Sequence, residues 1–170
     1  PYLGSMGIYL FNTELLVNVL RKGGERLDDF GGDIIPYLIG QGAAVYGYNY
    51  EGYWRDIGTI RSFYETNLEL TDDKPGFDFY DPDKPIFTHP RFLPCSRVVG
   101  CSFSKVLIAE GCNIEHATIE HSIIGVRSQI GDGSVVKDTI MMGGDYYGVL
   151  KNGAPLGIGR NCSIQGAIID

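Results

Sequence analysis

The apolar positions divide the sequence into two regions with different periods. Up to about residue 70, apolar residues recur three and four positions apart or in short runs, as in amphipathic helices and buried strands. After residue 98, an aliphatic residue recurs about every sixth position. We therefore predict an α/β region followed by a domain built from short repeats.

The first region contains three helix patterns, each preceded by a residue that can accept hydrogen bonds from the first helical N–H groups. Glycines at positions 23 and 24 are expected to end the first helix, and Pro36 is expected to kink the second. The candidate capping residues are Asn12 or Thr13, Asp28 or Asp29, and Thr59.

Three short apolar runs predict strands at residues 7–11, 44–50 and 53–57. Strands that alternate with helices indicate α/β character, so we assign residues 1–72 to an α/β domain. This segment is short for such a domain and has no glycine-rich phosphate loop of its own. We therefore expect it to be the C-terminal part of a domain that begins upstream.

The two regions are joined by a proline-rich segment. Residues 71–97 contain five of the eight prolines in the chain. Proline fixes its own backbone and restricts the residue before it to extended conformations, so such a segment is expected to be irregular. We predict that residues 73–97 cross from one domain to the next.

The second region has the pattern of hexapeptide repeats. Small residues often follow its aliphatic residues, and they allow tight corners between three short strands per coil. We predict a left-handed parallel β-helix over residues 98–170, with residues 143–156 extruded as a loop. The six-residue spacing is seen from Ile108 to Ile114, from Ile124 through Ile130 to Val136, and from Ile158 to Ile164.

Composition narrows the classes of partner. The chain has 14 basic and 21 acidic residues, a formal net charge of −7. We therefore expect neither nucleic acid nor an anionic membrane as a partner. No apolar run approaches the roughly 20 residues that span a bilayer. The four cysteines form no C-x-x-C pair, which favours a reducing compartment.

Four phrases carry a resemblance that covers essentially the whole chain. They are S-M-G-I-Y at residues 5–9, D-F-G at 29–31, Y-W-R-D-I-G-T at 53–59 and M-G-G-D-Y-Y at 142–147. In this order and spacing, they resemble the glucose-1-phosphate adenylyltransferases, also called ADP-glucose pyrophosphorylases. The resemblance implies the C-terminal part of a Rossmann-like nucleotidyltransferase domain followed by a left-handed β-helix. It also implies synthesis of ADP-glucose and pyrophosphate from ATP and glucose 1-phosphate with Mg²⁺, for glycogen or starch.

The resemblance also assigns site residues. Asp56 matches the carboxylate that binds Mg²⁺ and serves catalysis, and its alternative role is to cap the nearby helix start. Arg91 matches a contact for an anionic allosteric effector, and its alternative is a solvated ion pair. The aromatic residues of the implied sugar site have an alternative role as well, because without the resemblance they would be assigned to ordinary core packing. The implied glucose 1-phosphate site comprises Ser5, Tyr9, Asp29, Phe30 and Trp54.

The remaining expectations concern the whole protein. Most of the ATP site, including the glycine-rich loop, is expected upstream, so residues 1–170 alone should be inactive. The resemblance implies a homo- or heterotetramer located in bacterial cytoplasm or in a plastid.

The sequence is also compatible with two other functions. One is a non-catalytic regulatory subunit or assembly module of the same family. The other is a hexapeptide-repeat acyltransferase with His116 or His121 as its base, although this does not account for the W-R-D-I-G-T phrase.

Overall fold

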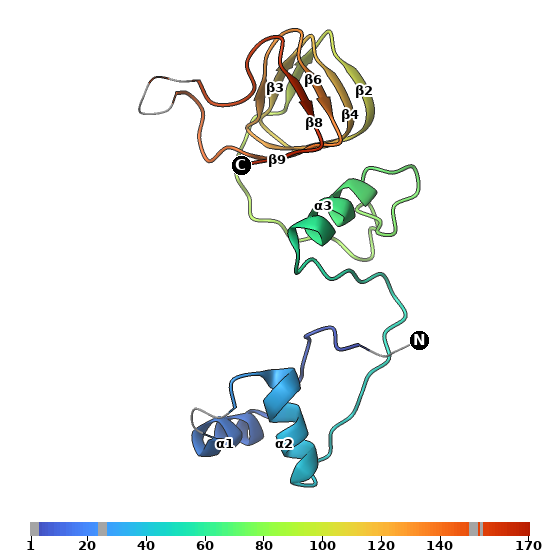
Figure 1. Cartoon of the computed structure of the whole chain (residues 1–170), viewed down its shortest axis with the longest axis vertical. Helices are drawn as coiled ribbons and strands as arrows, with labels where there is room; N and C mark the ends of the chain where they lie inside the picture. Colours follow the sequence, from blue (N-terminus) through green and yellow to red (C-terminus); the bar gives the residue numbers. More distant parts are fainter. Residues whose placement is uncertain (1–3, 24–26, 150–152, 154) are drawn as a thin grey trace. The chain divides into compact units, whose positions relative to one another are not determined.

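The structure, a computed structural model, describes residues 4–23, 27–149, 153 and 155–170. It contains two compact units, Pro1–Trp54 and Arg55–Asp170 (Figure 1). None of the helices among the described residues is long and apolar enough to cross a membrane.

The first unit is built on helices that begin where the sequence predicts. Helix α1 (Thr13–Gly23) starts after Asn12, whose Oδ1 accepts the Leu15 N–H at 3.1 Å. A π-helical turn, η2 (Phe30–Ile34), leads into α2 (Ile35–Gly40). Its small core consists of Val19, Ile34 and Leu38, with Phe11, Leu27 and Ala43 packed against it.

The second helix changes geometry at the predicted proline. Asp29 is the cap, because its carboxylate accepts the Gly32 N–H. Pro36 lies in the first turn of α2, where its missing N–H would have had no intrahelical partner. The chain is therefore π-helical before this turn and α-helical after it.

The three predicted strands are wrong. Residues 7–11, 44–50 and 53–57 are irregular. A strand exists only where a neighbouring strand completes its backbone hydrogen bonds, and none of the described residues before Arg97 forms such a pair. Several of their apolar side chains accordingly face solvent, as the exposed fractions of Leu10 (100%) and Tyr48 (90%) show, whereas Phe11 packs on the core of the first unit.

The second unit begins with a helix. Thr59 and Ser62 form a capping box at the start of α3 (Ile60–Glu69), since each side chain accepts the other's backbone N–H. Residues 71–96 contain neither helix nor strand, in line with their prolines. Helix α3 contacts strands β4 (Thr118–Val126) and β7 (Ile140–Gly143) and therefore lies in the same unit as the strands. The domain boundaries predicted at residues 72 and 97 stay predictions.

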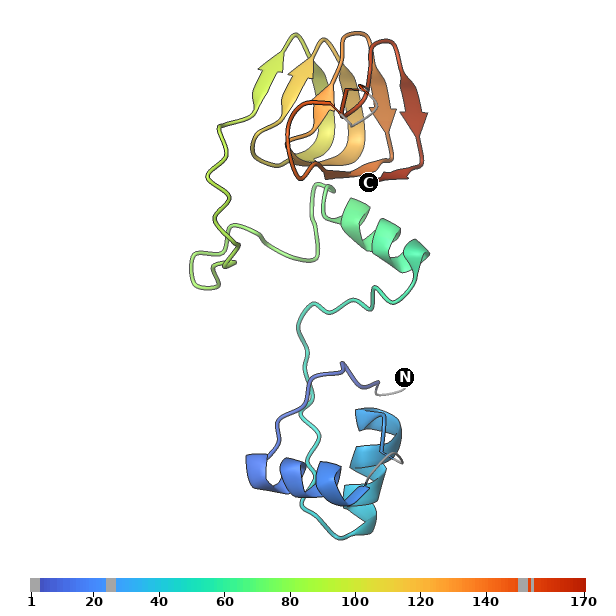
Figure 2. The ribbon, with the colours of Figure 1, turned by 90° about the vertical axis from the view of Figure 1, so that its left-hand side faces the viewer.

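The rest of this unit is a coiled stack of parallel strands (Figure 2). Val98 pairs with Ile114 and Ile114 with Ile130, a spacing of 16 residues per coil, whereas Ile119 pairs with Val136 at a spacing of 17. The strands are β1 (Arg97–Val99), β2 (Ser102–Ile108), β3 (Asn113–Glu115), β4 (Thr118–Val126), β5 (Gln129–Ile130), β6 (Val135–Lys137), β7 (Ile140–Gly143), β8 (Ser163–Gln165) and β9 (Ile168–Ile169).

The six-residue pattern fills the inside of this stack. Ile114, Ile124, Ile130 and Val136 are each at most 2% exposed. Successive coils bring the same position into register, so each aliphatic residue packs on the one above it. The repeat thus creates a continuous core without help from distant parts of the chain.

One corner of the stack consists of polar residues with left-handed backbone geometry. Strand register places Lys105, His121 and Asp138 in successive coils, with φ values of 54°, 44° and 46°. We call these three residues the corner column. Lys105 Nζ lies 3.1 Å from a carboxylate oxygen of Asp72, just beyond α3. The corner column therefore faces α3.

A longer connection interrupts the stack between β7 and β8. The Tyr147 hydroxyl donates to the Gly111 carbonyl at 2.9 Å, and Val149 and Pro155 form a single antiparallel bridge. The first contact joins the loop predicted at residues 143–156 to the stack, and the second lies within that loop. Residues 150–152 and 154 of the loop are outside the described part of the chain.

Candidate functional site

Four of the predicted sugar-site residues lie together in the first unit. The Tyr9 and Phe30 rings stack with centroids 5.8 Å apart and planes 19° apart. The Ser5 hydroxyl lies 2.9 Å from the Tyr9 hydroxyl, so one donates to the other. Asp29 precedes Phe30 at the start of η2. The irregular segment before α1 and the start of the second helix thus contribute to one cluster.

Phe11 supports the aromatic pair, although the sequence analysis did not select it. Its ring is tilted against Tyr9 at 6.3 Å and against Phe30 at 5.6 Å between centroids. It also packs on the core of the first unit. A signal existed, because Tyr9 and Phe11 are two residues apart and share one side of an extended segment.

Asp29 has one carboxylate oxygen committed to the fold and one available. Its Oδ1 accepts the Gly32 N–H, while Oδ2 has no donor among the residues that the structure describes. The side chain is exposed. A carboxylate oxygen in this position can accept a hydrogen bond from a sugar hydroxyl.

Asp33 is a second residue that the sequence analysis missed. Its Oδ2 accepts the N–H groups of Asp28 at 3.2 Å and of Asp29 at 3.0 Å. The signal was the spacing of two acidic residues four apart at a helix start, which resembles a capping box shifted by one residue.

Trp54 is the predicted sugar-site residue that lies apart from the aromatic cluster. It is 45% exposed and forms no ring contact with any aromatic residue in the described parts of the chain. The structure therefore assembles four of the five predicted residues of the sugar site.

Asp56 lies in a turn at the beginning of the second unit. Its Oδ1 accepts the Gly58 N–H at 3.0 Å, which fixes the chain just before the Thr59 cap. The neighbouring Arg55 is held by an ion pair with Glu69 of α3 at 2.8 Å. Asp56 thus has a structural role at the helix start, as the alternative to metal binding suggested.

A lone carboxylate is compatible with magnesium but not with a metal site made by this chain alone. No three His, Cys, Asp or Glu side chains within the described ranges are grouped to hold a metal. Mg²⁺ usually takes one or two carboxylates and completes its shell with water and substrate phosphates. The second oxygen of Asp56, Oδ2, accepts no hydrogen bond from a described residue and fits that limited role.

Arg91 lies in the irregular segment before β1. Its side chain is exposed and forms no ion pair with a described residue. Arg97, by contrast, is paired with Glu115 and lowers the pKa of that carboxyl group, chiefly by hydrogen bonding. Arg91 is therefore available to an anion, whereas Arg97 is not.

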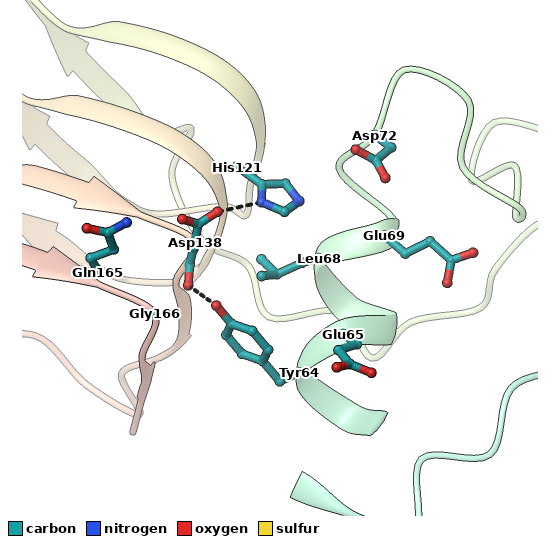
Figure 3. Close-up of a pocket in the computed structure, with 9 residues that line it drawn as sticks. All are labelled: Tyr64, Glu65, Leu68, Glu69, Asp72, His121, Asp138, Gln165 and Gly166. Atoms are coloured by element: carbon teal, nitrogen blue, oxygen red, sulfur yellow. Dashed lines mark hydrogen bonds and ion pairs between the residues drawn. The ribbon is translucent and has the colours of Figure 1, made fainter. Parts of the chain in front are cut away.

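A shallow cavity of about 440 Å³ lies between α3 and the corner column (Figure 3). The Tyr64 hydroxyl donates to the Asp138 carbonyl, and His121 Nδ1 lies 2.7 Å from the Asp138 carboxylate. Burial, with a smaller effect of Asp138, raises the pKa of Tyr64. The bond from Tyr64 to Asp138 links α3 to the stack, whereas the bond between His121 and Asp138 lies within the stack.

The two histidines give no support to the acyltransferase alternative. His121 points toward Asp138 and α3 in Figure 3, so its neighbours explain its position structurally. His116 is exposed at another corner of the stack.

Comparison with known proteins matches two families to two parts of the chain. Residues 1–73 match the family described as "Nucleotidyl transferase", and residues 91–170 match the "GLGC left-handed parallel beta-helix domain". The chain is 43% identical, over 179 aligned residues, to a protein of Triticum aestivum named glucose-1-phosphate adenylyltransferase small subunit, chloroplastic/amyloplastic. The alignment covers 100% of this chain and 38% of that relative. The predicted fold class and the predicted resemblance are confirmed.

Proposed function

We infer that this chain, which joins nucleotidyltransferase sequence to a GLGC-type left-handed β-helix, is part of a glucose-1-phosphate adenylyltransferase. The whole protein would make ADP-glucose and pyrophosphate from ATP and glucose 1-phosphate, in starch or glycogen synthesis. The observation that carries the proposal is the group formed by Ser5, Tyr9, Phe30 and Asp29 in the nucleotidyltransferase part.

This group suits a sugar phosphate. The stacked faces of Tyr9 and Phe30 offer apolar area to sugar C–H groups, and Asp29 Oδ2 can accept from a sugar hydroxyl. The linked hydroxyls of Ser5 and Tyr9 can donate to a ligand oxygen. We place Trp54 at the same site as a further wall.

The reaction itself needs alignment more than covalent help. A phosphate oxygen of glucose 1-phosphate attacks the α-phosphorus of ATP, and pyrophosphate leaves from the opposite side. Holding the sugar phosphate in line for this attack lowers the barrier by removing translational and rotational freedom. That is the role we assign to the sugar site.

Asp56 would hold the magnesium ion. The Gly58 N–H donates to Oδ1 and so fixes the carboxylate, and Oδ2 would be the oxygen that binds the ion. Magnesium, when bound, neutralises the charge on the phosphate oxygens. Because the described residues supply a single candidate ligand, ATP and the rest of the whole protein would have to complete the shell.

Regulation and assembly are assigned to the remaining parts. Arg91, exposed and without an ion pair in the described chain, would contact an anionic effector. Residues 1–72 would belong to the catalytic domain, 73–97 to the crossing and 98–170 to a β-helix that takes part in a homo- or heterotetramer. The name of the wheat relative favours a plastid location over bacterial cytoplasm.

The proposal is tested by assaying the full-length protein for pyrophosphate release from ATP and glucose 1-phosphate with Mg²⁺. Asp56→Asn should lower kcat by about 100-fold or more, because an amide binds magnesium far more weakly than a carboxylate. Asp78→Asn is the control, since Asp78 also accepts a backbone N–H in an exposed turn but lies in the proline-rich segment.

The alternatives give different results in the same assay. If the wild-type protein releases no pyrophosphate with any sugar phosphate, the catalytic proposal is wrong. Activation of a separate catalytic subunit by this protein would then identify it as a regulatory subunit.

A further inference from the structure

The Asp33 side chain fixes the backbone that presents Asp29. Asp33 lies in η2, is half-buried, and uses a single oxygen, Oδ2, to accept two backbone N–H groups. These belong to Asp28 at 3.2 Å and Asp29 at 3.0 Å. Both donors precede the first helical residue, where no intrahelical acceptor is available to them.

The polar groups of Asp29 are held on every side except one. Its N–H donates to Asp33, and its carbonyl accepts the N–H groups of Asp33 and Ile34, each at 3.0 Å. Its carboxylate Oδ1 accepts the Gly32 N–H. Among the described residues, no donor reaches Oδ2, which is therefore available to a ligand, and its direction follows from these bonds.

We propose that Asp33 is a positioning residue for the sugar-phosphate site, which rests on the proposed function. Asp33 need not touch the substrate. It holds the backbone of Asp29 in its extended conformation, with φ −119° and ψ 132°, and thereby also sets where Phe30 stacks on Tyr9. One carboxylate thus positions an acceptor and an aromatic wall of the same site.

Loss of the Asp33 carboxylate would release two N–H groups to water and let the helix start change conformation. Even a displacement of about 1 Å at a binding group can lower productive binding strongly. Because the displaced groups contact the sugar phosphate and not ATP, the effect should fall on the KM for glucose 1-phosphate. A general loss of folding would instead lower kcat, whichever of the two substrates is varied.

The experiment compares Asp33→Ala with Asp33→Asn in the full-length protein. The asparagine side-chain oxygen can accept the same two N–H groups, whereas alanine cannot. Asp78→Ala is the matched control, because it removes a carboxylate that accepts the Tyr80 N–H at 2.8 Å in a turn of the proline-rich segment. Steady-state kinetics are measured by pyrophosphate release with each substrate varied in turn.

We expect Asp33→Ala to raise the KM for glucose 1-phosphate about tenfold, as for loss of hydrogen bonds to a charged acceptor. Its kcat and its KM for ATP should change by less than about twofold, and Asp33→Asn should recover most of the affinity for the sugar phosphate. Asp78→Ala should match the wild type.

Two outcomes overturn this role for Asp33 while leaving the proposed function intact. One is that the wild-type protein is active and Asp33→Ala either leaves the KM for glucose 1-phosphate unchanged or raises the KM values for both substrates equally. The other is an Asp33→Asn protein as impaired as Asp33→Ala. A wild-type protein without turnover overturns the proposed function instead, and with it the premise of this inference.

Discussion

The β-helix and the first unit differ in how far their apolar side chains are exposed to solvent. In the β-helix, Ile114 and Ile124 are fully buried at 0% exposure. In the first unit, Ile8 is 74% exposed and Tyr46 is 89% exposed, although both lie in runs that predict strands. Among the residues that the structure describes, three are buried in the core of the first unit and eight in the core of the β-helix.

This difference reflects how far apart in the sequence the hydrogen-bonded strands of each region lie. Each coil of the β-helix pairs with the next coil about 16 residues along the chain, so the repeat supplies its own hydrogen bonds and its own core. A strand of an α/β domain pairs with segments far away in sequence. An apolar run in such a domain therefore indicates a strand, but the partner strands that complete its hydrogen bonds lie elsewhere in the sequence.

The largest expected contrast is in amide hydrogen exchange of the 170-residue chain. Amides of β4 are paired on both sides of the strand, whereas residues 44–50 form no strand. We expect exchange in β4 to be slower by on the order of 1,000-fold, because its opening requires unfolding of the stack. Comparable protection of residues 44–50 would contradict the exposed state of the first unit.

A pair of core and surface substitutions gives the next largest effect. Ile124→Ala should lower the free energy of unfolding of the β-helix by about 2–5 kcal/mol, since it leaves a cavity in a closely packed interior. Leu10→Ala in the same chain should change the free energy of unfolding of the first unit by less than about 0.5 kcal/mol, because Leu10 is fully exposed. Urea titration followed by circular dichroism measures both. Equal costs for the two substitutions would remove the contrast.

The smallest effect concerns pH. Hydrogen bonds from Arg97, then Asn113, hold the pKa of Glu115 below its ordinary value of 4.5. A lowered pKa in the folded state stabilises the fold above the unfolded-state pKa, and this contribution is lost as pH falls through the folded-state pKa. Stability of the β-helix should therefore decrease slightly below about pH 4.5.

Glu115→Gln should reduce this dependence on pH in urea titrations at low salt, because the ion pair is solvent-exposed and easily screened. Glu110→Gln is the control, since Glu110 forms no ion pair within the described residues. An unchanged pH profile in Glu115→Gln would show that the Arg97 pair contributes nothing measurable.

Local features of the fold could be predicted from the sequence. The caps at Asn12, Asp29 and Thr59 depend on residues within one helical turn, and the hexapeptide spacing depends on neighbouring coils. The three strands could not be predicted correctly, since strand formation depends on partners elsewhere. The position of α3 on the corner column also depends on distant contacts, such as that from Tyr64 to Asp138.

The candidate site was predicted in part. The resemblance selected Ser5, Tyr9, Asp29 and Phe30, and the structure brings them together. Phe11 and Asp33 contact these residues as well. Their spacing in the sequence was compatible with such contacts, but only the distances show that the contacts are made. The roles of Trp54, Asp56 and Arg91 stay predictions.

The assignment of the sugar-phosphate site is tested by measuring the KM for glucose 1-phosphate of full-length Asp29→Asn. Asp28→Asn, at the neighbouring position, is the control. Asparagine can keep the Gly32 hydrogen bond through its oxygen but replaces the available Oδ2 by an NH₂ group. We predict a KM raised by about tenfold to a hundredfold for Asp29→Asn, as for loss of a charged acceptor. Asp28→Asn should stay within about twofold of the wild type, because only its backbone N–H takes part in a described bond. An unchanged KM for Asp29→Asn, in a protein that turns over ATP and glucose 1-phosphate, would contradict the assignment of the sugar-phosphate site.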